Sequence, residues 1–230
     1  MIPGFDIIDL SYQINENIPT WEGNKGFEKK TVLDYPASVA RVMHYSMVAN
    51  AGTHIDSPSH FTPQASEIHH LNLSNLCVPI HLIDVRAKAH TDYMISLEDI
   101  AIYEQKYGPV RAGSIIIGLT GWDKHWADAK KYRAEDLNGD IHCPGFAADV
   151  GPFVLERNVV GLGIDTFSPD GSDMTFPLHL LLLGKEKYLI ENLTNLSKVP
   201  PVGAYLIALP LKIEGAAESP IRAIALVPQR

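Results

Sequence analysis

Short β-type runs separated by glycine and proline are the feature that most limits how this chain can fold. Seven runs, most of them rich in branched apolar residues, occupy residues 5–10, 42–48, 78–85, 114–119, 159–164, 205–211 and 221–227. The 17 glycines and 16 prolines are spread over all 230 residues, so no linker marks a domain boundary. We therefore expect residues 1–230 to form one domain with a large strand content.

Helices are fewer than strands in this sequence. Ser96 followed by two acidic residues predicts a helix start, and that helix should continue to Tyr107 before Gly108. Helically spaced apolar residues predict a second helix within residues 144–157, and Pro177 can open a short one through residue 183. Strands and helices do not alternate strictly, which disfavours a doubly wound parallel sheet. The expected class is a mixed α/β domain.

Composition and charge exclude several classes of function. Lys and Arg number 19 against 27 Asp and Glu, giving a net charge of -8, and no basic cluster exceeds two residues. Nucleic acid is therefore not an expected partner. No apolar run approaches the ~18 residues of a membrane span. The acidic start and two cysteines, Cys77 and Cys143, favour a cytoplasmic protein without a secretory signal or a disulfide framework.

Residues 50–60 carry a cluster of groups that can bind metal or transfer protons. Pro58 disfavours a helix there, and in an extended chain alternate residues share one face. Asn50, His54, Asp56 and His60 would then point together, and imidazole and carboxylate groups are ligands of zinc and manganese. A His-x-Asp pair is also a common structural feature. From these residues alone, a metal or catalytic role and a structural role stay equally open.

A second cluster lies later in the chain. His179 stands within the apolar segment 176–184, and Glu191 follows Leu189 and Ile190. A buried histidine needs a hydrogen-bond partner or a metal, and a buried carboxylate is costly unless it is paired. A buried His–Glu pair, a solvent-facing Glu191 and a metal site all fit this pattern.

Aromatic residues near these clusters are candidates for a substrate pocket. Trp21, Phe61 and Trp122 could form a wall for a flat or ring-bearing substrate, although tryptophan is often only part of the core. Asp165 could support a metal ligand or only cap a turn. The adjacent pair at residues 69–70 is interpreted as surface, because neighbouring side chains diverge in a strand.

At these residues the sequence resembles the metal-dependent cyclase family, which includes bacterial kynurenine formamidases and isatin hydrolases. The family signature His-x-Gly-Thr-His-x-Asp-x-Pro-x-His matches residues 50–60 at every fixed position except the first, where Asn50 stands. Residues 18–23, 121–122, 144–146 and 163–168 resemble further family blocks, and His179 and Glu191 have the family's late spacing. The resemblance implies a compact α/β domain with a β-barrel-like core and flanking helices, called a swivelling β/β/α fold, that forms homodimers or homotetramers.

The resemblance also implies roles for individual residues. His54, Asp56, His179 and Glu191 would be metal ligands, with Asn50 as a weaker one, and His60 would be the general acid and base. The expected cofactor is a divalent metal, zinc first and manganese second, with one or two ions per chain.

These roles predict a metal-dependent hydrolase that cleaves a C–N bond (amide, formamide or cyclic amide) or an ester. Metal-activated water would attack, and the substrate would be a small aromatic or cyclic molecule. The alternative is a catalytically silent, metal-bearing ligand-binding or assembly module of the same fold. Asn50 favours that alternative and His60 opposes it, since a binding module does not need a base.

Overall fold

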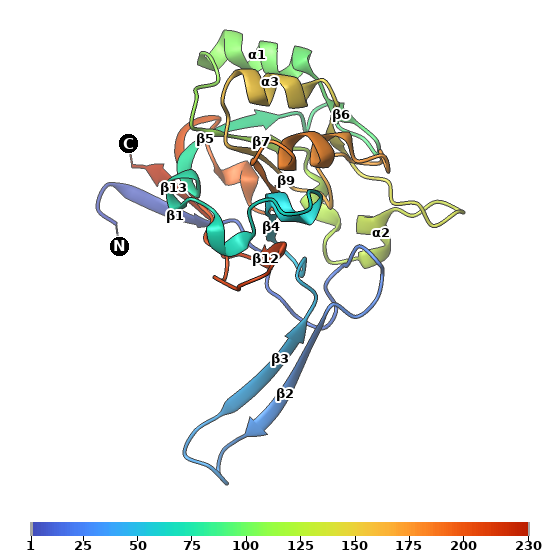
Figure 1. The fold of residues 1–230 in the computed structure, drawn as a ribbon, viewed down its shortest axis with the longest axis vertical. Helices are drawn as coiled ribbons and strands as arrows, with labels where there is room; N and C mark the ends of the chain where they lie inside the picture. Colours follow the sequence, from blue (N-terminus) through green and yellow to red (C-terminus); the bar gives the residue numbers. More distant parts are fainter. Residues whose placement is uncertain (1, 230) are drawn as a thin grey trace.

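A mixed sheet of nine strands organises the fold in the computed structural model, which describes residues 2–229. The strand order is β1–β13–β11–β5–β7–β9–β10–β4–β12, and the sheet curls into a half-barrel (Figure 1). The strands β5, β7, β9 and β10 are mutually parallel, while the remaining neighbours are antiparallel. Their bounds are β1 (Phe5–Asp9), β4 (His54–Asp56), β5 (Cys77–Asp84), β7 (Ile115–Leu119), β9 (Gly161–Ile164), β10 (Tyr188–Glu191), β11 (Val202–Ile207), β12 (Glu218–Pro220) and β13 (Ile224–Pro228).

The two faces of the sheet pack into separate apolar cores because strand side chains alternate. In β7, Ile115 and Ile117 enter one core, whereas Ile116 enters the other. Helices α1 (Leu97–Tyr107) and α3 (Val150–Glu156) cover the face of Ile116 (Figure 1). A capping box between Ser96 and Asp99 starts α1, as the sequence predicts. The short α2 (Ala129–Arg133) lies outside these two cores.

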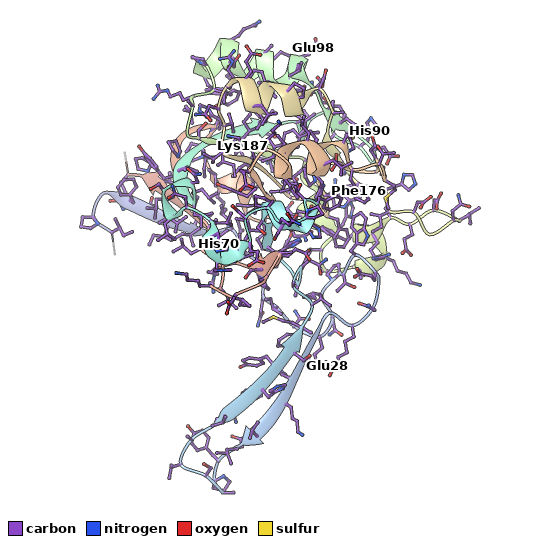
Figure 2. The ribbon with its side chains drawn as sticks, in the orientation of Figure 1. Glu28, His70, His90, Glu98, Phe176 and Lys187 are labelled. Atoms are coloured by element: carbon purple, nitrogen blue, oxygen red, sulfur yellow. The ribbon has the colours of Figure 1, made fainter. Side chains whose placement is uncertain are left out.

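A two-stranded hairpin projects from the body of the molecule (Figure 1). It consists of β2 (Phe27–Leu33) and β3 (Val42–Met47), which pair only with each other among the described strands. Glu28, labelled in Figure 2, lies on this arm. A third small sheet joins β6 (Met94–Ile95) to β8 (Gly145–Phe146). Among residues 2–229, no helix combines the length and apolar character that crossing a bilayer requires.

The predicted elements are largely present, with shifted bounds. Each of the seven β-type runs overlaps a strand, but β11 begins before the run 205–211 and ends at Ile207, within it. The helix expected within residues 144–157 begins only at Val150, because Gly145 and Phe146 belong to β8. The short helix after Pro177 includes a π-helical turn, His179–Leu183. A doubly wound sheet is absent in residues 2–229, as expected, although four central strands are parallel.

Candidate functional site

The strand β4 places two polar side chains on the sheet face that carries the helices. Ile55 points into the opposite core, so His54 and Asp56 point away from it. Antiparallel neighbours flank β4 on both sides: Glu191 of β10 lies opposite His54, and Glu218 of β12 lies opposite Asp56. Residues directly opposite each other share a face. Three adjacent strands therefore bring one imidazole and three carboxylates together.

His179 completes this cluster from the π-helical turn His179–Leu183. Its Nε2 atom lies 3.5 Å from Asp56 Oδ2 and 3.4 Å from Glu191 Oε1. His54 Nε2 lies 3.5 Å from Asp56 Oδ1 and 3.2 Å from Glu191 Oε2. Each of the two carboxylates thus offers one oxygen to each imidazole. All four side chains are buried.

Fixed partners on the far side of each imidazole aim both Nε2 atoms at the carboxylates. His54 Nδ1 lies 2.9 Å from the carbonyl oxygen of Gly52, which adopts a left-handed backbone with φ +69°. His179 Nδ1 lies 2.5 Å from Oδ2 of Asp170, which also accepts hydrogen bonds from two backbone N–H groups. A proton donated from Nδ1 leaves the Nε2 lone pair free to bind metal.

The electrostatics of the cluster also favour a bound cation. Burial alone would lower the pKa of His54, but contact with Glu191 and the charges of Asp56 and Glu191 raise it to about 9. The carboxylates Asp170, Asp56 and Glu191 likewise raise the pKa of His179 against the effect of burial. Burial would raise the pKa of Asp56, yet the facing imidazoles lower it. Positive charge is therefore favoured where the carboxylates converge.

The donor set fits a divalent metal ion. Within residues 2–229, the buried Oδ1 atom of Asp56 has no hydrogen-bond partner. A buried carboxylate oxygen without a partner is costly, and a cation would satisfy it. Two imidazole nitrogens and two carboxylates are ligands that both zinc and manganese accept. The geometry therefore brings together His54, Asp56, His179 and Glu191, the four residues that the family resemblance implies as ligands.

His60 and Asn50 line the same cavity; Asn50 precedes β4 in the chain and His60 follows it. His60 ends a 3₁₀ turn, Pro58–His60, rather than continuing the strand, so its position does not follow from strand alternation. Its side chain is partly exposed, and its Nδ1 atom lies 3.7 Å from Glu218 Oε2. Asn50 also lines the cavity, just before β4.

Four aromatic side chains form the wall of this cavity, which has a volume of about 220 Å³. Trp21 and Phe61 were expected there, whereas Phe167 and Phe176 were not. The ring centroids of Phe61 and Phe176 lie 5.5 Å apart, and Phe61 lies 4.7 Å from His179. Phe176, labelled in Figure 2, has a φ of +52°, which is strained for a bulky residue. The fold thus accepts backbone strain beside the polar cluster.

Trp122 does not line the cavity, contrary to the prediction. Its Nε1 donates a hydrogen bond to the carbonyl oxygen of Tyr132, and its ring is buried in a small core with Tyr132 and Phe167. Gly121 adopts a left-handed backbone where the 3₁₀ turn Trp122–His125 begins, and the indole packs inward from there. Trp122 therefore packs in this small core rather than contacting the cavity.

Other polar candidates lie outside the cavity. Asp165 accepts hydrogen bonds from the backbone N–H groups of Thr120 and Gly121, which makes it the cap of a turn. His69 and His70 lie on a 3₁₀ turn away from the cavity lining, with their rings 3.8 Å apart rather than divergent.

Two carboxylates of the site were missed by reasoning from the sequence. Asp170 lies nine residues before His179 but directly behind its ring. Glu218 lies in a stretch without clear periodicity, and only its pairing with β4 brings it to Asp56. Burial raises the pKa of Glu218. No residue spacing in the sequence predicts that Asp170 contacts His179 or that Glu218 lies opposite Asp56.

Comparison with known proteins agrees with this geometry. The family model described as "Putative cyclase" matches residues 8–171. An isatin hydrolase of Roseibium aggregatum is 34% identical, over 97% of this chain and 92% of that protein. A kynurenine formamidase of Bacillus anthracis is 28% identical, over 94% of this chain and 95% of that protein.

Solved structures agree as well. A crystal structure of an isatin hydrolase bound to the product analogue thioisatinate matches with a TM-score of 0.92 and 28% sequence identity. The match covers 98% of this chain and 94% of that one. With the family model, the curated relatives and the fold in agreement, the chain belongs to the cyclase family.

Proposed function

We propose that this chain is a metal-dependent hydrolase that cleaves the C–N bond of an aromatic formamide or cyclic amide. The observation that carries this proposal is the convergence of His54, Asp56, His179 and Glu191 beside the aromatic wall of one cavity. The names of the relatives supply the substrate class. Isatin is a cyclic aromatic amide, and kynurenine formamidase is named for an aromatic formamide. A small aryl ester is a second substrate to test.

In the proposed reaction, the metal ion would activate the carbonyl group and the water, and the protein side chains would transfer the proton and bind the aromatic ring. A divalent cation held by the four ligands would polarise a carbonyl oxygen and lower the pKa of a water molecule. His60 would take a proton from the attacking water and return it to the leaving nitrogen. Trp21, Phe61 and Phe176 would hold the aromatic ring and exclude bulk water.

Zinc is the proposed metal, and manganese is the alternative. Asn50 offers an amide oxygen, a weaker ligand for zinc than imidazole. The substitution would therefore weaken the binding of one ion where the family signature has a histidine. Elemental analysis of the native chain and of Asn50→His would give the stoichiometry. Two equivalents in the native chain would indicate a two-ion centre. One equivalent that rises to two in Asn50→His would indicate a second site weakened at Asn50.

A turnover assay tests the hydrolase proposal directly. The protein would be stripped with a chelator, reloaded with Zn²⁺ or Mn²⁺, and assayed on isatin, N-formylkynurenine and an aryl ester. We expect turnover of at least one amide that disappears with the chelator and returns with metal. Turnover in the stripped protein, or metal-dependent binding of these compounds without turnover, would contradict the proposal. The latter result would favour the non-catalytic module.

The proposal extends to the whole chain and its assembly. Residues 1–230 would act as one hydrolase domain, because the cavity draws side chains from Trp21 through Glu218. A homodimer or homotetramer is proposed because the arm of β2 and β3 exposes apolar side chains. A cytoplasmic location is proposed because Cys77 and Cys143 are both free thiols.

A further inference from the structure

We infer that Glu218 is an additional ligand of the cation in this cavity. The inference rests on the proposed metal centre and extends it to a strand, β12, that the sequence did not connect with the site. Glu218 lines the cavity together with His54, Asp56 and Glu191. Its side chain is only 16% exposed, although it ends in a carboxylate.

The pairing of β4 with its two neighbours gives Glu218 a position equivalent to that of Glu191. On one side, β10 sets Glu191 opposite His54; on the other, β12 sets Glu218 opposite Asp56. Both pairs are antiparallel, so both carboxylates project from the sheet on the face of His54 and Asp56. A ligand atom from each of His54, Asp56 and Glu218 lies within 4.8 Å of the other two. These three residues can therefore contact one ion.

The juxtaposition of Asp56 and Glu218 is unfavourable without a cation. Like charges directly opposite each other destabilise antiparallel strands, and burial increases the repulsion. In the described part of the chain, the one basic side chain within 4 Å of Glu218 is His60, whose Nδ1 lies at 3.7 Å, beyond hydrogen-bond distance. The imidazoles of His54 and His179 face Asp56, but within residues 2–229 neither lies within 4 Å of Glu218. A divalent ion between the two carboxylates would supply the close positive partner that Glu218 lacks.

A third carboxylate also changes which metal the site prefers. Together with Asn50, it adds oxygen donors to the two imidazoles, and oxygen donors suit manganese better than the softer imidazole does. Removing the Glu218 carboxylate should therefore weaken Mn²⁺ binding more than Zn²⁺ binding. That difference between two ions is a signature that a general loosening of the fold would not produce.

The test compares Glu218→Gln with the native chain and with a matched control, Glu214→Gln. Glu214 lies four residues before Glu218, and its side chain is exposed. The dissociation constants of Mn²⁺ and Zn²⁺ would be measured by competition with a chromophoric chelator. Unfolding temperatures would be recorded with and without metal. We expect Glu218→Gln to weaken Mn²⁺ binding by about 10- to 100-fold and Zn²⁺ binding less, with Glu214→Gln unchanged.

In the absence of metal, Glu218→Gln should not destabilise the fold. Because Gln removes the repulsion with Asp56, metal-free Glu218→Gln should unfold at the same or a higher temperature than the native chain. Its rise in unfolding temperature on adding Mn²⁺ should be smaller. Glu218→Asp, which keeps the charge, should retain more affinity than Glu218→Gln, and it provides a second variant if the first folds poorly.

The outcomes separate this inference from the proposed function. A native chain that binds neither ion would contradict the metal centre itself. A native chain that binds metal, with Glu218→Gln binding both ions equally well, would overturn the role of Glu218 alone. Unchanged affinity accompanied by a shifted pH profile of turnover would overturn it too, and would make Glu218 a positioning residue for His60.

Discussion

At the residue scale, the contacts behind the imidazoles matter as much as the ligands themselves. The Gly52 carbonyl and the Asp170 carboxylate lie at Nδ1 of His54 and His179, so both histidines direct Nε2 at the same carboxylates. In the described chain, no such oxygen lies within hydrogen-bond distance of His60 Nδ1: the nearest carboxylate, Glu218 Oε2, is 3.7 Å away, and the His60 side chain stays 29% exposed. A ligand atom of His60 also lies within 4.8 Å of ligand atoms of Asp56 and His179, and because its ring is held less tightly than theirs it is free to transfer a proton to a group bound there.

Replacing His60 tests that distinction. In His60→Ala we expect turnover to fall by about 10²- to 10⁴-fold, because the proton acceptor and donor is lost. Metal content should stay at the native level, since every proposed ligand remains in place. Activity and elemental analysis would be measured on the same preparations, with the exposed His70→Ala as control. Full activity in His60→Ala would show that another group transfers the proton.

The two cysteines give a prediction about burial and pH. Cys143 is fully buried, and burial raises the pKa of its thiol to about 12, whereas Cys77 is exposed. At pH 8 the Cys143 thiol is therefore almost entirely protonated and unreactive. A disulfide reagent should modify one thiol in the native protein and two after unfolding. Rapid modification of both thiols at pH 8 would show that the core around Cys143 opens readily.

At the element scale, the sequence predicts local structure better than pairing. The runs that became β5, β7 and β9 could be recognised because each is apolar and bounded by turn residues. β4 and β12 have three residues each, too few for a periodic signal, and their role depends on pairing with each other and with β10. The motif residues of the site were therefore predicted, whereas Glu218 and Asp170 needed the fold.

Glycine in β9 shows how the sheet supports the site. A Cβ atom at Gly161 would collide with the carbonyl oxygen of Tyr188, the first residue of β10, which carries Glu191. We expect Gly161→Ala to lower the free energy of unfolding by about 1–3 kcal/mol or more and to weaken metal binding, because β10 must move. Chemical denaturation and chelator competition would measure the two effects.

Gly163→Ala, in the same strand, is the matched control. There the added Cβ would meet side-chain carbons of Leu193 and Ile117 at 3.1 and 3.3 Å, and side chains shift more easily than backbone. Its cost in stability should be smaller, and metal binding should stay near native. Equal losses in the two variants would show that close packing of β9 against β10 does not position Glu191.

At the scale of the whole molecule, the arm and the cavity are neighbours. Trp21 and Asn50 line the cavity, and the chain between them forms the arm of β2 and β3. An isolated two-stranded hairpin is marginally stable in water, yet this one exposes Val32, Val39 and Tyr45 by more than half. Contact with a second copy would cover these residues and place that copy beside the cavity.

Charge supports the same assembly. Residues 27–47 carry three basic and two acidic side chains, whereas the chain as a whole has a net charge of -8, so the arm of one copy suits the acidic body of another. Light scattering after size exclusion tests this assembly, and we expect it to give a dimer or tetramer for the native chain. Val32→Glu with Tyr45→Glu should shift it to monomer, since buried charge is costly and the acidic body would repel it. Ile102→Glu, equally exposed but on α1 at the far end of the molecule, should leave the mass unchanged (Figure 1). A native monomer, or an arm variant that keeps the native mass, would show that the arm does not hold copies together.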